Sequence, residues 1–248
     1  MAGIMRQDLY RELFEVEDHH WWHKQKRLMV HSLIERNCRQ PGRVLDLGAG
    51  SGKLLDELKQ KGWQVAGVDA DEKAVRLARR RGLKLVKLNQ NQIRLPFTDN
   101  NFDLVVSLDT LEHVKTDAAA IGEMKRVVKP EGLILITVPA NPWLFSYWDK
   151  MLGHFRRYSK TSLARLIKTA GLRPVFVSFF FTYLLLPVSL IRWFRNRLKL
   201  TAVSDFQLTP VNFLVAPLMA FLGFLERQVV KFTPLPFGLS LICLIKKK

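Results

Sequence analysis

The stretch that decides the fold is VLDLGAGSGKLL, residues Val44–Leu55. A β-rich run passes through closely spaced glycines into a helical pattern, which is typical of a loop that holds a ligand at the start of a helix. A kinase-type phosphate loop is excluded, because Leu47 stands where that motif needs its first Gly and Leu54 where it needs Ser or Thr.

The glycines follow a Gly-x-Gly-x-Gly spacing at positions 48, 50 and 52, an imperfect match to a dinucleotide fingerprint. Asp69 lies 21 residues beyond Gly48, where an acidic residue grips ribose hydroxyls. Asp46, just before the glycines, would repel a pyrophosphate but attract an ammonium group. S-adenosylmethionine carries a ribose, an ammonium and a sulfonium and no phosphate, so the loop suits that cofactor.

Outward from the loop, short β-rich runs alternate with helical patterns between residues 44 and 138. Such alternation indicates parallel strands joined by crossover helices. We therefore expect a doubly wound, Rossmann-like α/β fold with a mostly parallel seven-stranded sheet and helices on both faces. KPEG, residues 129–132, is expected to form a turn, Ser159 to cap a helix, and PFGLSLICLI, residues 236–245, to hold the last strand.

Length and composition set the domain plan. A chain of 248 residues has room for one main domain with additions. We expect a helical cap over residues 1–40, a cofactor-binding core over 41–173, and the last strands with an apolar, basic helical insertion over 174–248. Cys38 and Cys243 suggest neither a metal cluster nor a disulfide framework. The acidic N-terminal segment argues against a secretory signal, so a cytoplasmic location is expected.

The basic character is concentrated in the C-terminal part. Residues 141–248 hold 16 Lys and Arg against 3 Asp and Glu, within a chain whose net charge is +17. Uncharged runs cover 174–191 and 206–225, although Pro187, Pro210 and Pro217 interrupt them. These prolines, together with the basic residues around Trp193, favour a position in the membrane interface over a bilayer crossing. The alternative is that these runs are ordinary core. The basic residues in question are Arg192, Arg195, Arg197 and Lys199.

Four segments in the expected order resemble the class I S-adenosylmethionine-dependent methyltransferases. They are VLDLGAGSG (44–52), GVD (67–69), LPFTDNNFDLVVSLDTLEHV (95–114) and KPEGLILITVPA (129–140). The resemblance implies that Asp46 and the loop residues Gly48, Ala49 and Gly50 hold the methionine part of the cofactor. It implies that Asp69 and Ala70 hold the ribose, and that the segment after the fourth strand, with Leu108 and Asp109, lines the methyl-transfer site.

One departure from the family concerns adenine. The family usually has an Asp after the third strand, whereas this chain has LNQNQ, so Asn89 or Asn91 is expected to accept the adenine hydrogen bond instead. The flanking segments EVEDHHWWHKQKR and NPWLFSYWDKMLGHFRRYS resemble a subgroup linked to membrane glycan and lipid pathways.

Two histidines are candidates for a general base. Methyl transfer is an in-line displacement that needs alignment of the acceptor and no metal, so none is expected. A hydroxyl acceptor must lose a proton, and His113 or His154 could take it. A structural role for either histidine is the competing interpretation.

Near His154, Arg156, Arg157 and Tyr158 could form a fork for an anionic group of the acceptor, with Asp149 beside them. A solvated basic turn is the alternative. Trp22 is expected to close over the pocket or rest at the membrane surface.

These observations favour a methyltransferase that acts on a hydroxyl of an amphipathic, anionic acceptor, such as a lipid-linked sugar or a polyprenyl-bearing molecule, at an anionic membrane surface. A quinone-precursor or other small-molecule methyltransferase is the nearest alternative. An RNA methyltransferase is disfavoured because the basic residues border apolar runs rather than exposed stacking aromatics on a polar surface. A non-catalytic membrane scaffold would not need Asp46 and Asp69. The sequence leaves the oligomeric state open.

Overall fold

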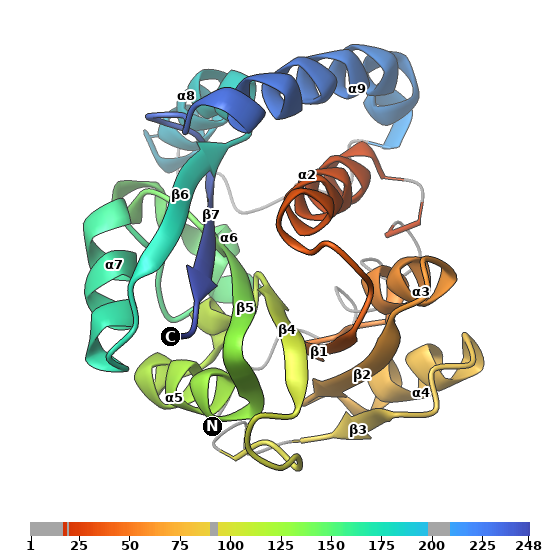
Figure 1. Cartoon of the computed structure of the whole chain (residues 1–248). Helices are drawn as coiled ribbons and strands as arrows, with labels where there is room; N and C mark the ends of the chain where they lie inside the picture. Colours follow the sequence, from red (N-terminus) through yellow and green to blue (C-terminus); the bar gives the residue numbers. More distant parts are fainter. Residues whose placement is uncertain (1–16, 19, 90–93, 198–208) are drawn as a thin grey trace.

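The computed structural model describes residues 17–18, 20–89, 94–197 and 209–248. One seven-stranded sheet has the strand order β3-β2-β1-β4-β5-β7-β6 (Figure 1). The first five strands are parallel, so the sheet is mostly parallel as expected from the sequence, and β7 is antiparallel to both of its neighbours. The strands are β1 (Arg43–Leu47), β2 (Gln64–Asp69), β3 (Val86–Leu88), β4 (Phe102–Leu108), β5 (Val128–Pro139), β6 (Pro174–Phe180) and β7 (Ser240–Lys246).

Helices cover both faces of this sheet (Figure 1). The helices are α2 (Trp21–Asn37), α3 (Lys53–Gln60), α4 (Glu72–Arg80), α5 (Asp117–Val127), α6 (Tyr147–Met151), α7 (Lys160–Thr169), α8 (Thr182–Arg197) and α9 (Thr209–Phe232), with short 3-10 turns η1 (Leu111–His113) and η2 (Pro142–Leu144). Successive side chains of a strand point to opposite faces of the sheet, so each face has its own buried cluster. Val44 belongs to the cluster with α2, α3 and α4, and the next residue, Leu45, belongs to the cluster with α5 and α7.

Local chemistry fixes several boundaries. Asp71 caps α4 by accepting from the backbone N–H groups of Lys73 and Ala74, at 2.7 and 2.9 Å. Ser159 caps α7 as expected. The KPEG segment does not separate α5 from the strand. Instead, Phe102 pairs with Val128 and Leu104 with Leu133, so residues 129–132 form a bulge within β5.

The C-terminal part differs from the sequence expectation in two ways. The first half of the apolar run 174–191 is the edge strand β6, and only its second half is helical. Pro187 and Pro217 lie inside α8 and α9 without ending them. Both helices fall between β6 and β7 in the chain, and within the described residues no helix has the length and apolar character to span a membrane.

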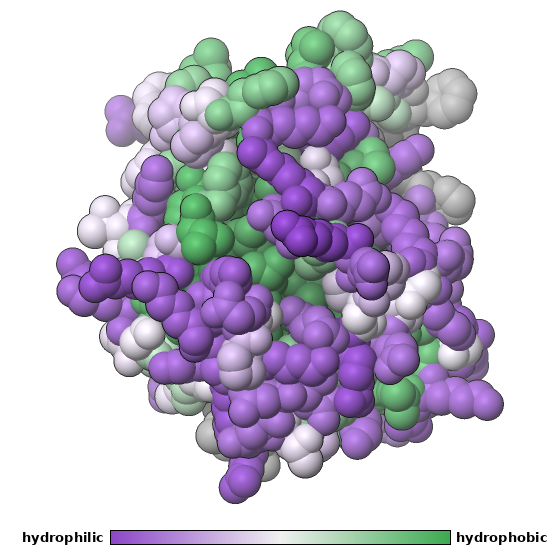
Figure 2. Space-filling model, viewed as in Figure 1, coloured by the Kyte–Doolittle hydropathy of each residue, from purple (hydrophilic) through white to green (hydrophobic). Residues whose placement is uncertain are grey.

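The two helices expose one apolar face, whose residues are between 43% and 89% exposed. Their spacing of three and four residues along α9 places them on one side of that helix. Figure 2 shows hydrophobic residues gathered over α8 and α9 at the top of the molecule. The apolar face consists of Leu186, Leu190, Ile191, Trp193 and Phe194 on α8 and Leu214, Leu218, Phe221, Leu225, Val229 and Phe232 on α9.

On its other side α9 packs against α2 and α8. Gly223 of α9 approaches α2 so closely that a Cβ there would lie 2.4 Å from the Gln25 Oε1 atom. The buried Glu226 accepts hydrogen bonds from the backbone N–H groups of Phe181 and Thr182, both at 2.8 Å, and from the Thr182 hydroxyl at 2.6 Å. This carboxylate therefore ties α9 to the start of α8.

Candidate active site

The glycine loop lies at the carboxyl end of β1, between β2 and β4, which is the switch point where ligands bind in doubly wound sheets. Gly48, Gly50 and Gly52 all have positive φ, at 83°, 54° and 79°. A Cβ on Gly48 would lie 2.1 Å from the Thr110 Oγ1 atom, so glycine is required there by space as well as by conformation.

Three acidic side chains surround this loop. Burial, together with the nearby Asp69 and Glu17, raises the pKa of Asp46 to about 8. Burial also raises the pKa values of Asp69 and of Glu17 above their ordinary range. Asp69 accepts from the Gly50 N–H at 2.8 Å, and the Ser51 hydroxyl donates to Glu17. Sequence reasoning missed Glu17, because it reaches the loop from the N-terminal segment.

This cluster fits a cationic ligand. The buried Oδ1 atom of Asp46 has no hydrogen-bond partner within the described part of the chain. Neighbouring carboxyls of one sign make ionisation costly, and a ligand ammonium or sulfonium would relieve that cost. Asp46 and Asp69 are the residues that the family resemblance assigns to the methionine and ribose parts of S-adenosylmethionine, and this acidic setting suits a cation.

The other predicted cofactor residues line the same edge of the sheet. Ala49 is buried in the loop, Ala70 follows β2, and Leu108 ends β4. The Asn89 N–H donates to the Asp69 carbonyl at 2.7 Å, which brings Asn89 beside the ribose position. Asn91 lies outside the described residues.

A largely buried ion pair lies at the carboxyl end of β4. Lys26, from α2, contacts Asp109, and the Thr137 hydroxyl donates to Asp109 at 2.9 Å. Burial would raise the pKa of Asp109, but the Lys26 ammonium outweighs it and holds that pKa below its ordinary range. Asp109 has a φ of 48°, so backbone strain accompanies this position. Sequence reasoning missed Lys26, since only the packing of α2 brings it here.

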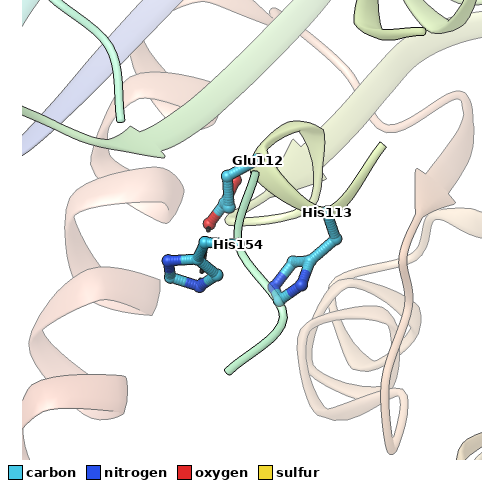
Figure 3. A group of neighbouring side chains, drawn as sticks. All are labelled: Glu112, His113 and His154. Carbon is cyan, nitrogen blue, oxygen red and sulfur yellow. Dashed lines mark ion pairs between the residues drawn. The ribbon is translucent and has the colours of Figure 1, made fainter. Parts of the chain in front are cut away.

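The two candidate histidines meet beside a buried glutamate (Figure 3). The rings of His113 and His154 lie 4.6 Å apart in an edge-to-face arrangement, and His154 Nε2 is 4.0 Å from Glu112 Oε1. One ligand atom from each residue falls within 4.8 Å of the others, so this group could hold a divalent cation. Glu112 is fully buried, and neither carboxyl oxygen has a hydrogen-bond partner among the described residues.

The electrostatics separate the roles of these three residues. Burial and the neighbouring His154 lower the pKa of His113 to about 3, so its ring stays neutral and is a weak base. Burial, then the charge of Asp109, raises the pKa of the Glu112 carboxyl well above its ordinary value. His154 has a different setting, because the buried Asp149 carboxylate lies 3.1 Å from its Nδ1 atom.

Asp149 organises the surrounding segment. It contacts Arg157 Nε at 2.7 Å and Arg192 Nη1 at 3.2 Å in addition to His154. Burial opposes ionisation, but the His154 hydrogen bond and the two guanidinium groups hold the pKa of Asp149 well below its ordinary value. Arg192 was expected at the membrane surface, yet its side chain is 13% exposed and pairs with Asp149.

The expected arginine fork is not formed. Arg157 joins Asp149, whereas Arg156 pairs with Asp117 at 2.5 Å, and the buried Tyr158 hydroxyl donates to Asp117 at 2.8 Å. Each guanidinium is therefore committed to a separate carboxylate of the protein. The two side chains diverge because the segment before α7 is not helical and adjacent residues face different neighbours.

Trp22 lies between the core and the C-terminal helices. Its ring stacks on Phe181 with centroids 4.1 Å apart, and the Lys26 ammonium is 5.9 Å from the Trp22 centroid. The residue thus connects α2, the Lys26–Asp109 pair and the start of α8.

Comparisons with known proteins agree with this geometry. Residues 21–176 match the family model described as "Methyltransferase domain". A protein of Mycolicibacterium smegmatis named probable S-adenosylmethionine-dependent methyltransferase is 29% identical over 158 residues, which cover 62% of this chain and 60% of that protein. The ubiquinone biosynthesis O-methyltransferase of Pseudomonas aeruginosa is 32% identical over 147 residues, covering 52% of this chain and 62% of that protein. The chain thus spans about 60% of the length of these curated relatives.

Solved structures share the fold. A methyltransferase from Thermotoga maritima superposes with a TM-score of 0.60 at 17% identity, covering 97% of this chain and 96% of that one. Geranyl diphosphate C-methyltransferase from Streptomyces coelicolor gives a TM-score of 0.57 at 15% identity, covering 87% of this chain and 76% of that one.

Proposed function

The chain belongs to the class I S-adenosylmethionine-dependent methyltransferases, and from this premise we propose that it methylates a hydroxyl group of an amphipathic, anionic acceptor at a membrane surface. The observation that carries the methyl-transfer part is the acidic cluster of Asp46, Asp69 and Glu17 around the glycine loop. Bound S-adenosylmethionine supplies a methyl group already activated by the sulfonium.

His154 is the proposed general base. Asp149 accepts a hydrogen bond from its Nδ1–H and so leaves Nε2 as the proton acceptor, the same logic by which a carboxylate orients a catalytic histidine in hydrolases. Nε2 of His154 would accept the proton that the acceptor hydroxyl loses when it is methylated. His113 is disfavoured because its lowered pKa makes it too weak a base.

The Lys26–Asp109 pair and Glu112 would position the acceptor. Lys26 and Glu112 are buried and Asp109 is half-buried, close to the carboxyl end of β4. Side chains held in place in this way can align an acceptor. In this arrangement Arg156 and Arg157 support the site through Asp117 and Asp149 rather than binding the acceptor directly.

The apolar face of α8 and α9 supports the membrane part of the proposal. Large exposed aromatic and aliphatic residues gather over α8 and α9 (Figure 2), and such a surface is uncommon on a protein that meets only water. Helices that bury one apolar side in the lipid interface have this character. With the enzyme attached to the membrane surface, an amphipathic acceptor could reach the site while the acceptor stays in the bilayer.

A small phenolic acceptor is the second candidate function. The similarity to ubiquinone biosynthesis O-methyltransferase favours it. Arg156 and Arg157, which were expected to bind an anionic group of the acceptor, pair instead with Asp117 and Asp149. A lipid-linked anionic acceptor and a phenolic quinone precursor should therefore be assayed side by side.

Equilibrium dialysis with labelled S-adenosylmethionine tests the cofactor site. Wild type and the exposed-surface control Asp99→Ala should bind equally, whereas Asp69→Ala should bind at least about tenfold more weakly, the cost of a lost charged hydrogen-bond acceptor. Equal binding by Asp69→Ala would place the cofactor elsewhere and overturn the assignment.

A further inference from the structure

A groove of about 800 Å³ runs between α2 and α9, away from the cofactor loop. It begins where Gly223 brings the two helices together and opens toward their C-terminal ends. Figure 2 shows strongly hydrophilic side chains between the hydrophobic surface of α9 and the body of the molecule. The lining consists of Leu28, His31, Ser32, Glu35, Arg36, Lys61, Phe224, Arg227, Gln228, Lys231 and Phe232.

The groove has an excess of positive charge. Four cationic residues line it against one carboxylate, Glu35, and that carboxylate pairs with Lys61 at 2.6 Å. The other three cations contact neutral oxygens: Arg36 donates to the Lys231 carbonyl, Arg227 to the Gln25 side chain, and Lys231 to Gln228 at 2.9 Å. Lys231 also lies within electrostatic reach of Glu35, and Arg227 within reach of the buried Glu226. The groove still holds more cationic than acidic side chains, so it would attract an anion.

The rim of the same groove is apolar. Phe232 is 89% exposed and Phe224 is 48% exposed, and Phe232 also belongs to the apolar face of α9. Cations thus lie directly beside a surface suited to hydrocarbon. A phospholipid likewise has its charged phosphate next to its acyl chains, at the boundary between headgroups and hydrocarbon.

We propose that the groove between α2 and α9 binds the phosphate headgroup of an anionic phospholipid, with the acyl chains against the apolar face of α9. This inference rests on the membrane part of the proposed function and adds the site and the lipid class. Arg36, Arg227 and Lys231 contact the phosphate, and Phe224 and Phe232 contact the first segments of the acyl chains. Nucleic acid fits less well, because the exposed aromatic residues here adjoin an apolar helix face rather than a polar one.

Vesicle sedimentation tests the site with the full chain. Phosphatidylcholine vesicles are compared with vesicles that also contain phosphatidylglycerol, at low and high salt. Arg36→Gln/Lys231→Gln should reduce partitioning onto the anionic vesicles by about thirtyfold, from the usual contribution of two cations near a charged membrane. Binding to neutral vesicles should be unchanged. The matched control Arg80→Gln/Lys84→Gln removes two exposed charges from the α4 side and should behave as wild type.

The outcomes separate the inference from the proposed function. Unchanged anionic binding by Arg36→Gln/Lys231→Gln, or an equal loss in the Arg80→Gln/Lys84→Gln control, overturns the groove and leaves membrane association intact. Failure of wild type to bind either vesicle overturns both. Leu218→Ser/Phe221→Ser should lose binding to both vesicle types. Salt-sensitive binding of wild type to RNA, with no binding to anionic vesicles, would also overturn the inference. Binding of labelled S-adenosylmethionine is measured for every variant to confirm that it is folded.

Discussion

Replacing Asp46 with Asn should stabilise the cofactor-free protein, and the gain should grow with pH. An unfolded chain releases the Asp46 proton near the ordinary pKa of 3.8, whereas the folded chain retains it up to about pH 8. Between these pH values the unfolded state binds fewer protons, so this carboxyl lowers the stability of wild type as the pH rises. Asn has a similar shape but does not titrate, so the substitution removes this pH-dependent loss of stability.

The magnitude follows from the size of the pKa shift. One pKa unit corresponds to about 1.4 kcal/mol, so at pH 7 the retained proton costs about 4 kcal/mol, and at pH 5 about 2 kcal/mol. Urea denaturation of both proteins without cofactor should show Asp46→Asn more stable by a margin that widens by about 2–3 kcal/mol between pH 5 and pH 7.

The exposed control Asp99→Asn should show no such widening. A stability difference between Asp46→Asn and wild type that stays constant from pH 5 to pH 7 would refute the reasoning, as would a variant less stable than wild type at pH 7. The same variant should bind S-adenosylmethionine more weakly. Its gain in stability would then reflect strain that the free protein carries in order to receive a cationic ligand.

Three further substitutions address the site and its support. His154→Gln should lower the methyl-transfer rate by about 10²–10⁴-fold with little change in cofactor affinity, and an equal fall in both would contradict its role as a base. Glu226→Ala removes the acceptor of three hydrogen bonds and should lower the free energy of unfolding by about 2–3 kcal/mol in urea; a loss below about 0.5 kcal/mol would count against it. Gly48→Ala should abolish binding of labelled S-adenosylmethionine, because its Cβ would lie 2.1 Å from Thr110 Oγ1, whereas Gly122→Ala, with nothing within 4 Å, should bind normally.

The cofactor half of the molecule was predictable because its signals are local. Closely spaced glycines between a strand and a helix require a particular loop, and Asp69 follows at the end of the next strand. The structure has this loop, the parallel strands and a last strand where the sequence indicated them, and the antiparallel direction of that last strand was not predicted. Asp46 and Asp69 lie together at the loop for the same reason: adjacent parallel strands end at one edge of the sheet.

The acceptor half was less predictable because packing assembles it from distant segments. Lys26 comes from the N-terminal region, and a sequence pattern does not state which way a helix will face across the sheet. Arg156 and Arg157 are adjacent in sequence yet bind different carboxylates. Arg192 had the character of a surface cation, but Asp149 draws it inward. A sequence shows which residues are charged, but the residue that neutralises each charge depends on the tertiary structure.

The most direct test of the account is transfer of label from methyl-labelled S-adenosylmethionine into a lipid extract of membranes. Wild type should place label in the organic phase, in a compound retained by anion exchange, and Asp69→Ala and His154→Gln should not. Label found instead in a neutral phenolic compound would favour the second candidate function. If wild type binds the cofactor and transfers no label to any lipid fraction, the claim of a membrane-bound acceptor is contradicted.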